Sequence, residues 1–255
     1  MRRLSGPVVL LALGMLLAGP IAEMAAPAYA AQDPAARASC CKQTAIVKPA
    51  FDREILGGFE PTAKERRAQE RGKVTVRIRD TSTATMKVVQ SETFVRAPVP
   101  AIWAVILDYD AYPRRFHQME LSETVLKSGD WEHHYTVVRY PWPWGKRWTL
   151  NTIHHDTDRG FARFKRVEGS IKEIEGTWEV REVGPATSLL RYGVRMDPGL
   201  ELIPTWVVPW ATSIVVPDIL KSVGKEAELR WIRSPKSDLP GGGGTDRTPR
   251  RPTKD

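Results

Sequence analysis

Cysteine is almost absent from this chain of 255 residues, which has two, Cys40 and Cys41. A disulfide between adjacent residues is strained, and such a bond is rarely structural. In an oxidising compartment the two thiols pair between chains or remain reactive. We therefore assign neither cysteine a role in the fold, and we expect no thiol catalysis.

The apolar run near the start of the chain, Val8–Leu17, is short. It has ten residues, whereas a helix that crosses a bilayer needs about 20. The run follows the positively charged Met1–Arg3 and precedes the small residues Ala28 and Ala30. This pattern predicts a secretory signal peptide over residues 1–30 and an exported protein, periplasmic or secreted. A membrane anchor is the alternative for the same segment.

Motifs of several common enzyme classes are also missing. The sequence has no serine elbow, no zinc-protease helix and no phosphate-binding loop, so nothing in it requires a nucleophile. The formal charge of +8 favours contact with anionic membrane surfaces or polyanions. We expect no nucleic-acid partner, because the chain is predicted to be exported and has no nucleic-acid-binding motif.

Basic residues gather in a short charged segment and in the tail. They are Lys64, Arg66, Arg67, Arg71 and Lys73, and then Arg247, Arg250 and Arg251. Each such charge contributes about 1 kcal/mol near an anionic membrane, so transient membrane contact is one hypothesis. The plainer interpretation is a solvated helix face and a solubilising tail.

Composition divides the rest of the chain into three parts. Residues 31–61 begin with many small residues and prolines, and we interpret them as a linker or leader. Residues 62–233 form one predicted domain, since 42% hydrophobic residues are enough for one sizeable core. Residues 234–255 are rich in Pro, Gly and charge, which predicts a disordered tail.

Apolar periodicity predicts the elements of this domain. A charged helix covers 62–71, with Thr62 as its cap and Gly72 at its end. Apolar residues at helical spacing predict a second helix over Pro98–Leu107. Alternation and β-branched residues predict eight strands, at 73–79, 86–96, 119–127, 131–140, 147–155, 161–167, 171–183 and 188–196. Short connections between the later strands indicate an antiparallel meander.

The last predicted element starts near Ile203 and ends at Arg233, with Pro209 and Pro217 expected to break or kink it. Its later part has one apolar stripe at helical spacing, formed by Val215, Ile219, Leu220, Val223, Ala227 and Trp231. A curved sheet has an apolar face that must be covered, and this helix is long enough to cover it. The sequence therefore predicts an α+β fold with a curved antiparallel sheet around a long C-terminal helix.

Three segments resemble a known family. They are Ala97–Asp110, similar to the family's first helix and the acidic-aromatic turn after it, Tyr140–Arg147, similar to its Pro-Trp-Pro and Arg segment, and Met196–Gly199 with Ile203–Trp206, similar to the start of its last helix. In this order the chain resembles a START-like domain of the SRPBCC superfamily, which includes polyketide cyclases and coenzyme Q-binding proteins. The resemblance runs from about Lys73 to Trp231. It implies a helix-grip fold and a lipid or other apolar ligand, but not by itself any chemistry.

The tryptophans of the turn Pro141–Trp148 also indicate an apolar ligand. Three tryptophans in eight residues are more apolar surface than a turn needs, and large aromatic side chains line cores or ligand cavities. Many relatives have an acidic residue at the position of Trp148, so a polar contact made by that acid is not carried over to this chain.

Strand alternation selects candidate residues for the wall of a cavity. The proposed ligand-binding residues are Trp103, Tyr135, Val137, Trp148, Trp178, Tyr192, Val194, Met196, Trp206, Trp210, Ile214 and Ile219. The alternative for each is a place in a solid core, which is the commoner fate of an apolar strand face.

Four histidines form two pairs, His133-His134 and His154-His155, on either side of the Trp-Pro turn. If Tyr140 pairs with Arg147 across the turn, His133 faces His154. Zinc or copper is a hypothesis for such a pair, but two ligands on each face leave the site incomplete. We therefore expect neither a metal site nor a cofactor.

The function most consistent with the sequence is an exported carrier of a hydrophobic small molecule or lipid, such as a sterol, a quinone or a fatty acyl lipid. The alternative is an enzyme of the polyketide cyclase or dehydratase type that uses the same cavity. Its acid–base candidates are His133, Tyr135, Asp156 and Glu179, although no residue is required by a motif to be catalytic.

Overall fold

The computed structural model describes residues 45–52, 54–81, 86–140, 145–197, 199 and 207–233, with the side chains of the last helix described from Val215 onward. The predicted signal peptide, both cysteines, the predicted tail and residues 141–144 of the Trp-Pro turn lie outside the described residues.

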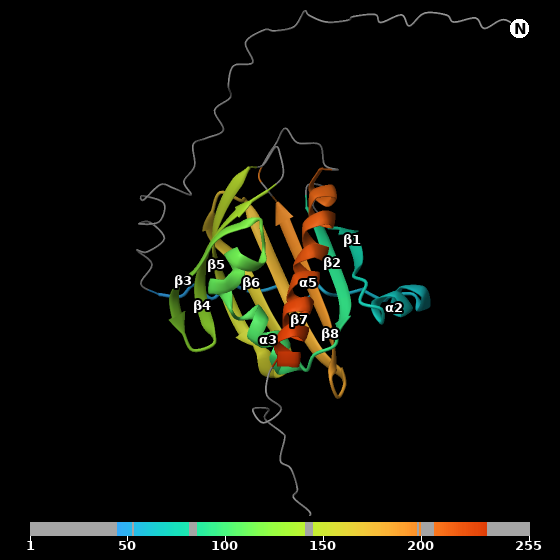
Figure 1. Cartoon of the computed structure of the whole chain (residues 1–255). Helices are drawn as coiled ribbons and strands as arrows, with labels where there is room; N and C mark the ends of the chain where they lie inside the picture. Colours follow the sequence, from blue (N-terminus) through green and yellow to red (C-terminus); the bar gives the residue numbers. More distant parts are fainter. Residues whose placement is uncertain are drawn as a thin grey trace, which may run out of the picture.

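One antiparallel sheet of eight strands forms the centre of the molecule (Figure 1). Its strand order is β1-β2-β8-β7-β6-β5-β4-β3, so consecutive strands are neighbours except where β2 pairs with β8. The strands are β1 (Thr75–Asp80), β2 (Lys87–Val95), β3 (Met119–Ser128), β4 (Trp131–Arg139), β5 (Lys146–Asp156), β6 (Phe161–Gly169), β7 (Glu173–Gly184) and β8 (Thr187–Asp197).

The helices are α2 (Ala63–Gln69), α3 (Val99–Ile106), the single-turn α4 (Tyr112–Arg115) and the long α5 (Val207–Arg233). Figure 1 shows the sheet curving around α5, with α3 beside that helix and α2 at the far edge. The predicted fold class is therefore confirmed: an α+β, helix-grip arrangement in which an antiparallel sheet wraps around the C-terminal helix.

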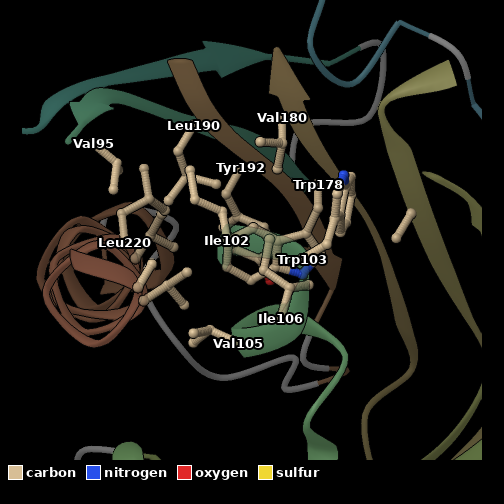
Figure 2. Packing of buried hydrophobic residues seen from close by; sticks show 14 of the residues in the cluster. Val95, Ile102, Trp103, Val105, Ile106, Trp178, Val180, Leu190, Tyr192 and Leu220 are labelled. Carbon is tan, nitrogen blue, oxygen red and sulfur yellow. The ribbon is translucent and has the colours of Figure 1, made fainter. Parts of the chain in front are cut away.

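The main core lies between α5, α3 and the β2–β8–β7 half of the inner face (Figure 2). Leu220 and Val223 of α5 and Ile102 and Ile106 of α3 are fully buried against Leu190 of β8. Burial of each such side chain stabilises the fold by about 1.5–3 kcal/mol. The apolar stripe of the last helix thus covers the sheet.

Three local features of the helices can be compared with their predictions. Thr62 caps α2, because its side chain accepts a hydrogen bond from the Glu65 backbone while the Glu65 carboxylate accepts one from the Thr62 backbone. Gly72 follows that helix with a φ of 77°, a value that favours glycine. The break expected at Pro217 does not occur, since α5 runs through this residue.

The outer face of the sheet is covered by a segment that the sequence analysis placed in the linker. Residues 45–61 belong to the folded domain where they are described, because Ile55 is 1% exposed and Leu56 and Phe59 are also buried. We call residues 45–52 and 54–60 the N-terminal strap. The amide of Gln90 in β2 donates hydrogen bonds to the carbonyls of Ile55 and Gly57.

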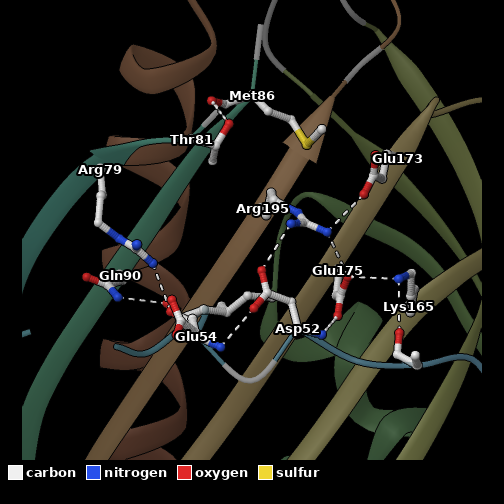
Figure 3. Close-up of polar contacts among 12 residues, drawn as sticks. Asp52, Glu54, Arg79, Thr81, Met86, Gln90, Lys165, Glu173, Glu175 and Arg195 are labelled. Carbon is white, nitrogen blue, oxygen red and sulfur yellow. Dashed lines mark hydrogen bonds and ion pairs between the residues drawn. The ribbon is translucent and has the colours of Figure 1, made fainter. Parts of the chain in front are cut away.

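Charged side chains hold the strap where it crosses β6, β7 and β8 (Figure 3). The fully buried Glu175 carboxylate accepts from the Asp52 backbone N–H and lies 3.0 Å from the Arg195 guanidinium and 3.2 Å from Lys165. Arg195 also pairs with Asp52 at 3.0 Å. The predicted linker, residues 31–61, therefore includes residues that belong to the folded domain. The sequence did not indicate this, because single polar residues in an irregular segment have no periodic pattern.

The β4–β5 register also differs from the expectation. Tyr140 donates its backbone N–H to Gly145, not to Arg147, so the turn is two residues tighter. His133 consequently faces Thr152, and His154 faces Trp131, whose ring it stacks on at 4.2 Å between centroids. The expected His133–His154 pair is wrong.

Candidate ligand-binding cavity

A cavity of about 160 Å³ lies between α5 and the inner face of β3–β8. The helix contributes Val215 and Ile219, and the segment after α3 contributes Tyr109, Tyr112 and Phe116. The main core fills the other half of the same face. The cavity therefore occupies the part of the sheet that α3 does not reach.

Aromatic rings form the apolar wall of the cavity. Trp178 and Tyr192 are paired across β7 and β8, with ring centroids 4.3 Å apart, and Phe164 of β6 stacks on Tyr192 at 6.3 Å. Tyr112 and Phe116 meet edge to face at 4.9 Å on the opposite side. Glycine is needed beneath this wall at Gly176, where a Cβ would lie 2.3 Å from the Phe164 ring.

One side of the cavity is polar. Asn151 of β5 donates from Nδ2 to the Thr149 hydroxyl at 2.9 Å, and that hydroxyl is 2.9 Å from the Thr136 hydroxyl of β4. All three residues line the cavity and are at least nine-tenths buried. The Asn151 Oδ1 atom has no hydrogen-bond partner among the described residues. An unpaired buried acceptor is costly, so this strip is suited to a ligand that donates a hydrogen bond.

His134 continues the polar strip, and its hydrogen bonds fix its tautomer. Ser122 donates its hydroxyl proton to the Tyr109 carbonyl at 2.7 Å, so its oxygen accepts from His134 Nε2 at 2.9 Å. The proton therefore sits on Nε2 and leaves Nδ1 as an acceptor. Burial lowers the pKa of His134 to about 4, although the nearby Glu132 opposes this change. At neutral pH His134 is an uncharged imidazole.

Further titratable groups lie behind this residue. The Tyr109 ring is 4.6 Å from the His134 ring and 6.0 Å from that of His155, centroid to centroid. His155 Nε2 is 3.6 Å from the buried carboxylate of Glu132. Desolvation raises the pKa of the Tyr109 phenol well above its usual value, and the Glu132 charge adds to this effect. The cavity therefore has a neutral phenol and a neutral imidazole side by side.

Six of the proposed ligand-binding residues come from the inner side of the fold. Trp178, Tyr192 and Ile219 line the cavity. Trp103 and Val194 lie in the main core instead, and Met196 is buried without lining the cavity. Alternation along the strands predicts that these side chains face inward. Whether an inward side chain lines the cavity or lies in the core depends on where α3 packs.

Three other proposed residues lie on the outer face. Tyr135 and Val137 form a separate cluster with Leu150, and Trp148 packs against it. The cavity is lined by the alternate residues of the same strand, His134, Thr136 and Val138. The expectation of an inward Tyr135 and Val137 is wrong. The rule that apolar residues face inward fails on β4, because its inward residues His134 and Thr136 are polar and its apolar residues are buried in a cluster on the outer face.

The remaining proposed residues, Trp206, Trp210 and Ile214, have no described side chains, so their predicted role stays a prediction. The acid–base candidates of the sequence analysis, His133, Tyr135, Asp156 and Glu179, do not line the cavity. His133 instead accepts a hydrogen bond from Val47 of the strap, and Glu179 pairs with Arg191 at 2.6 Å.

The polar strip and the tyrosines of the cavity were not predicted from the sequence. Tyr109 and Tyr112 belong to the acidic-aromatic turn, a signal that was noticed but given no role. Thr136 and Asn151 lie at inner positions once the register is known. Among the described residues, no group of three His, Cys, Asp or Glu side chains is placed to hold a metal ion, and none of the described helices has the length and apolarity of a membrane span.

Part of the chain that forms this cavity matches a known protein family. Residues 95–219 match the family model described as polyketide cyclase/dehydrase and lipid transport. The zhui aromatase/cyclase from Streptomyces sp. R1128 is similar in structure with a TM-score of 0.53 and 18% identity, over 58% of this chain and 97% of that one.

A second similar structure is the STAR-related lipid transfer protein from Xanthomonas axonopodis (fragment 25–204). Its TM-score is 0.50 and its identity 17%, over 60% of this chain and 93% of that one. At such identities the likeness shows the fold alone. In sequence, none of the curated proteins is significantly similar to this chain.

Proposed function

We propose that this chain, whose residues 95–219 match the family of polyketide cyclases, dehydrases and lipid-transport proteins, binds and carries a hydrophobic ligand in the cavity under α5. The observation that carries the proposal is the cavity wall itself, in which Trp178, Tyr192 and Phe164 face Ile219 of the helix. Apolar concave sites with a few polar groups are the usual form of a small-molecule site.

The volume sets the size of what is enclosed. At about 160 Å³ the cavity is below the ~300–1,000 Å³ of most ligand sites, and an apolar cavity of about 150 Å³ holds benzene. The enclosed part of the ligand is therefore about the size of one ring. A small aromatic molecule fits whole, whereas a sterol, quinone or acyl lipid enters with one end.

The polar strip sets the chemistry of the enclosed end. The unpaired Asn151 Oδ1 and the Nδ1 of His134 are both acceptors, so the ligand that suits them has an O–H or N–H group. Meeting one buried acceptor recovers about 1–3 kcal/mol of desolvation cost. An apolar molecule with a hydroxyl thus binds better than the matching hydrocarbon.

Export belongs to the same proposal. The sequence supports it through the charged start, the ten-residue apolar run and the small residues before position 31. The protein then acts in the periplasm or outside the cell, where its basic surface makes transient contact with anionic membranes during loading or release.

Native mass spectrometry of the purified protein, followed by lipid extraction, tests the proposal. We expect a co-purified hydrophobic molecule, or binding of an added single-ring alcohol such as 4-propylphenol with a Kd in the micromolar range, which is about −8 kcal/mol. A protein that carries nothing and binds neither 4-propylphenol nor a quinone or sterol at millimolar concentration contradicts it.

An enzyme of the polyketide cyclase type is the second candidate, and the Tyr109–His134 contact favours it. The neutral imidazole offers a lone pair to a substrate proton and the adjacent phenol offers a proton, but burial makes the imidazole a weaker base and the phenol a weaker acid than the free side chains. Turnover of a poly-β-ketone substrate that disappears in His134→Phe, while ligand binding remains, would identify an enzyme. Equal turnover in both forms excludes this role for His134.

A further inference from the structure

A second and larger hollow, of about 630 Å³, lies on the outer face of the sheet. Phe94 of β2 and Leu189 of β8 are register partners, and Leu189 is in turn the partner of Arg181 of β7. Their chain neighbours Val95, Leu190 and Val180 belong to the inner core, so this row faces outward. The hollow is therefore separated from the ligand cavity by the sheet.

Four arginines from different elements line this hollow: Arg66 and Arg71 at the end of α2, Arg96 after β2, and Arg181. The carboxylates in its wall are those of Glu70 and Glu228, and Glu228 already accepts the backbone N–H of Arg96. The hollow therefore has an excess of positive charge. We call it the arginine groove.

None of the four guanidinium groups makes an ion pair or a hydrogen bond with another described residue. The neighbouring arginines behave differently, since Arg77 pairs with Glu65 at 2.7 Å and Arg191 with Glu92 at 3.0 Å. The buried Glu92 carboxylate interacts with Arg66 and Arg181 through their charges, but it pairs directly with Arg191. The four like charges around one hollow therefore still repel one another, and an anion seated among them removes that repulsion. Arginine also binds phosphate through two parallel hydrogen bonds.

The floor of the arginine groove is apolar. Phe94 and Leu189 form it, and Val183 stands at the rim with 48% of its surface exposed. A volume of 630 Å³ is within the ~300–1,000 Å³ that small-molecule sites have. A simple inorganic anion fills little of it and leaves the apolar surface in water.

We propose that the arginine groove binds a phosphate group attached to an apolar chain, with the phosphate between Arg66 and Arg181 and the chain against Phe94 and Val183. This site is independent of the cavity under α5, because the two hollows share no residue. Basic residues that the sequence placed on a solvated helix face thus join Arg96 and Arg181, which are distant in the chain, in one site.

Calorimetric titration of the full chain with octyl phosphate, inorganic phosphate and the uncharged octyl glucoside tests this. Octyl phosphate binds at least about tenfold more tightly than inorganic phosphate, because only it contacts the apolar floor. Arg66→Gln and Arg181→Gln each weaken octyl phosphate binding by about tenfold, the effect of one charge-assisted hydrogen-bond pair. Val183→Ser weakens octyl phosphate binding and leaves inorganic phosphate binding unchanged.

Arg67→Gln is the matched control, since Arg67 is the exposed neighbour of Arg66 on the same helix and does not line the groove. It leaves octyl phosphate binding unchanged. The proposal is overturned if Arg67→Gln weakens binding as much as Arg66→Gln, which indicates general surface charge. It is also overturned if inorganic phosphate binds as tightly as octyl phosphate. Octyl glucoside has the same chain without the phosphate, so the proposal is overturned as well if octyl glucoside binds the groove as tightly as octyl phosphate. Binding of 4-propylphenol to Arg181→Gln reports on the cavity separately, because Arg181 does not line it.

Discussion

Trp178 of β7 lies directly opposite Tyr192 of β8, and their rings are 4.3 Å apart at the wall of the cavity. The pair stands at the boundary between the packed and the open halves of the inner face, because both residues belong to the main core and also line the cavity. Substitutions here change stability and ligand binding together. A matched residue on the outer face separates the two effects.

Trp178→Leu should lower the free energy of unfolding by about 3 kcal/mol, since it removes a large buried ring, and should weaken 4-propylphenol binding. Trp131→Leu is the control. Trp131 stacks on His154 on the outer face, so its loss reduces stability and leaves ligand binding intact. Urea unfolding and calorimetry measure both quantities. Equal loss of binding in the two variants contradicts the assignment of the cavity.

Asn151→Leu should reduce the preference for a hydroxyl-bearing ligand. In the native protein 4-propylphenol binds more tightly than propylbenzene, and in the variant the ratio of the two affinities falls, because the unpaired Oδ1 acceptor is gone and only the Nδ1 of His134 remains. Thr152→Val is the control, since Thr152 points to the outer face and donates to the Val47 carbonyl. It should lower stability and keep the preference. Competitive titration measures the ratio of the Kd values of 4-propylphenol and propylbenzene in each variant. An unchanged ratio in Asn151→Leu contradicts the role of Asn151.

Stability should fall in mild acid because of His134. Burial holds the pKa of this imidazole at about 4, compared with 6.5 when unfolded. Between these values the unfolded chain binds the extra proton, so stability is complete above about pH 6.5 and decreases as the pH drops toward 4, by about 3 kcal/mol in all. Burial lowers the pKa of His133 and His154 as well, which adds to the effect.

Urea unfolding at pH 7.5, 6 and 5 measures this dependence. His134→Gln should reduce the pH dependence to the part that comes from His133 and His154, while His117→Gln, at an exposed position, should leave it unchanged. A native protein whose stability is constant from pH 7.5 to 5 contradicts the buried neutral state of His134.

Gly193→Ala should displace the N-terminal strap. A Cβ at this position would lie 2.7 Å from Ile55 Cγ2 and 2.8 Å from Leu56 Cδ2, so the strap has to move at a cost of about 1–3 kcal/mol. Limited proteolysis should then cut within residues 45–60. Gly184→Ala, where the nearest atom is 3.9 Å away, is the control and should resist cleavage like the native protein. Uncleaved Gly193→Ala would show that the strap adapts.

Local patterns determined the elements and the fold class. Alternation along β2, β7 and β8, the capping of α2 by Thr62 and the apolar stripe of α5 all act within one element, where each side chain's direction follows from its position in the chain. These patterns predicted strand ends within about two residues. They also predicted that a long helix covers the inner face.

Tertiary structure decided which residues meet across elements. The turn after Tyr140 set the β4–β5 register, and that register placed Asn151 opposite His134. Packing of α3 against β7 and β8 decided that Trp103 joins the core while Trp178 borders the cavity. The arginine groove likewise combines Arg66 with Arg181. Periodicity contains no information on such contacts, because they depend on how separate elements are positioned in space.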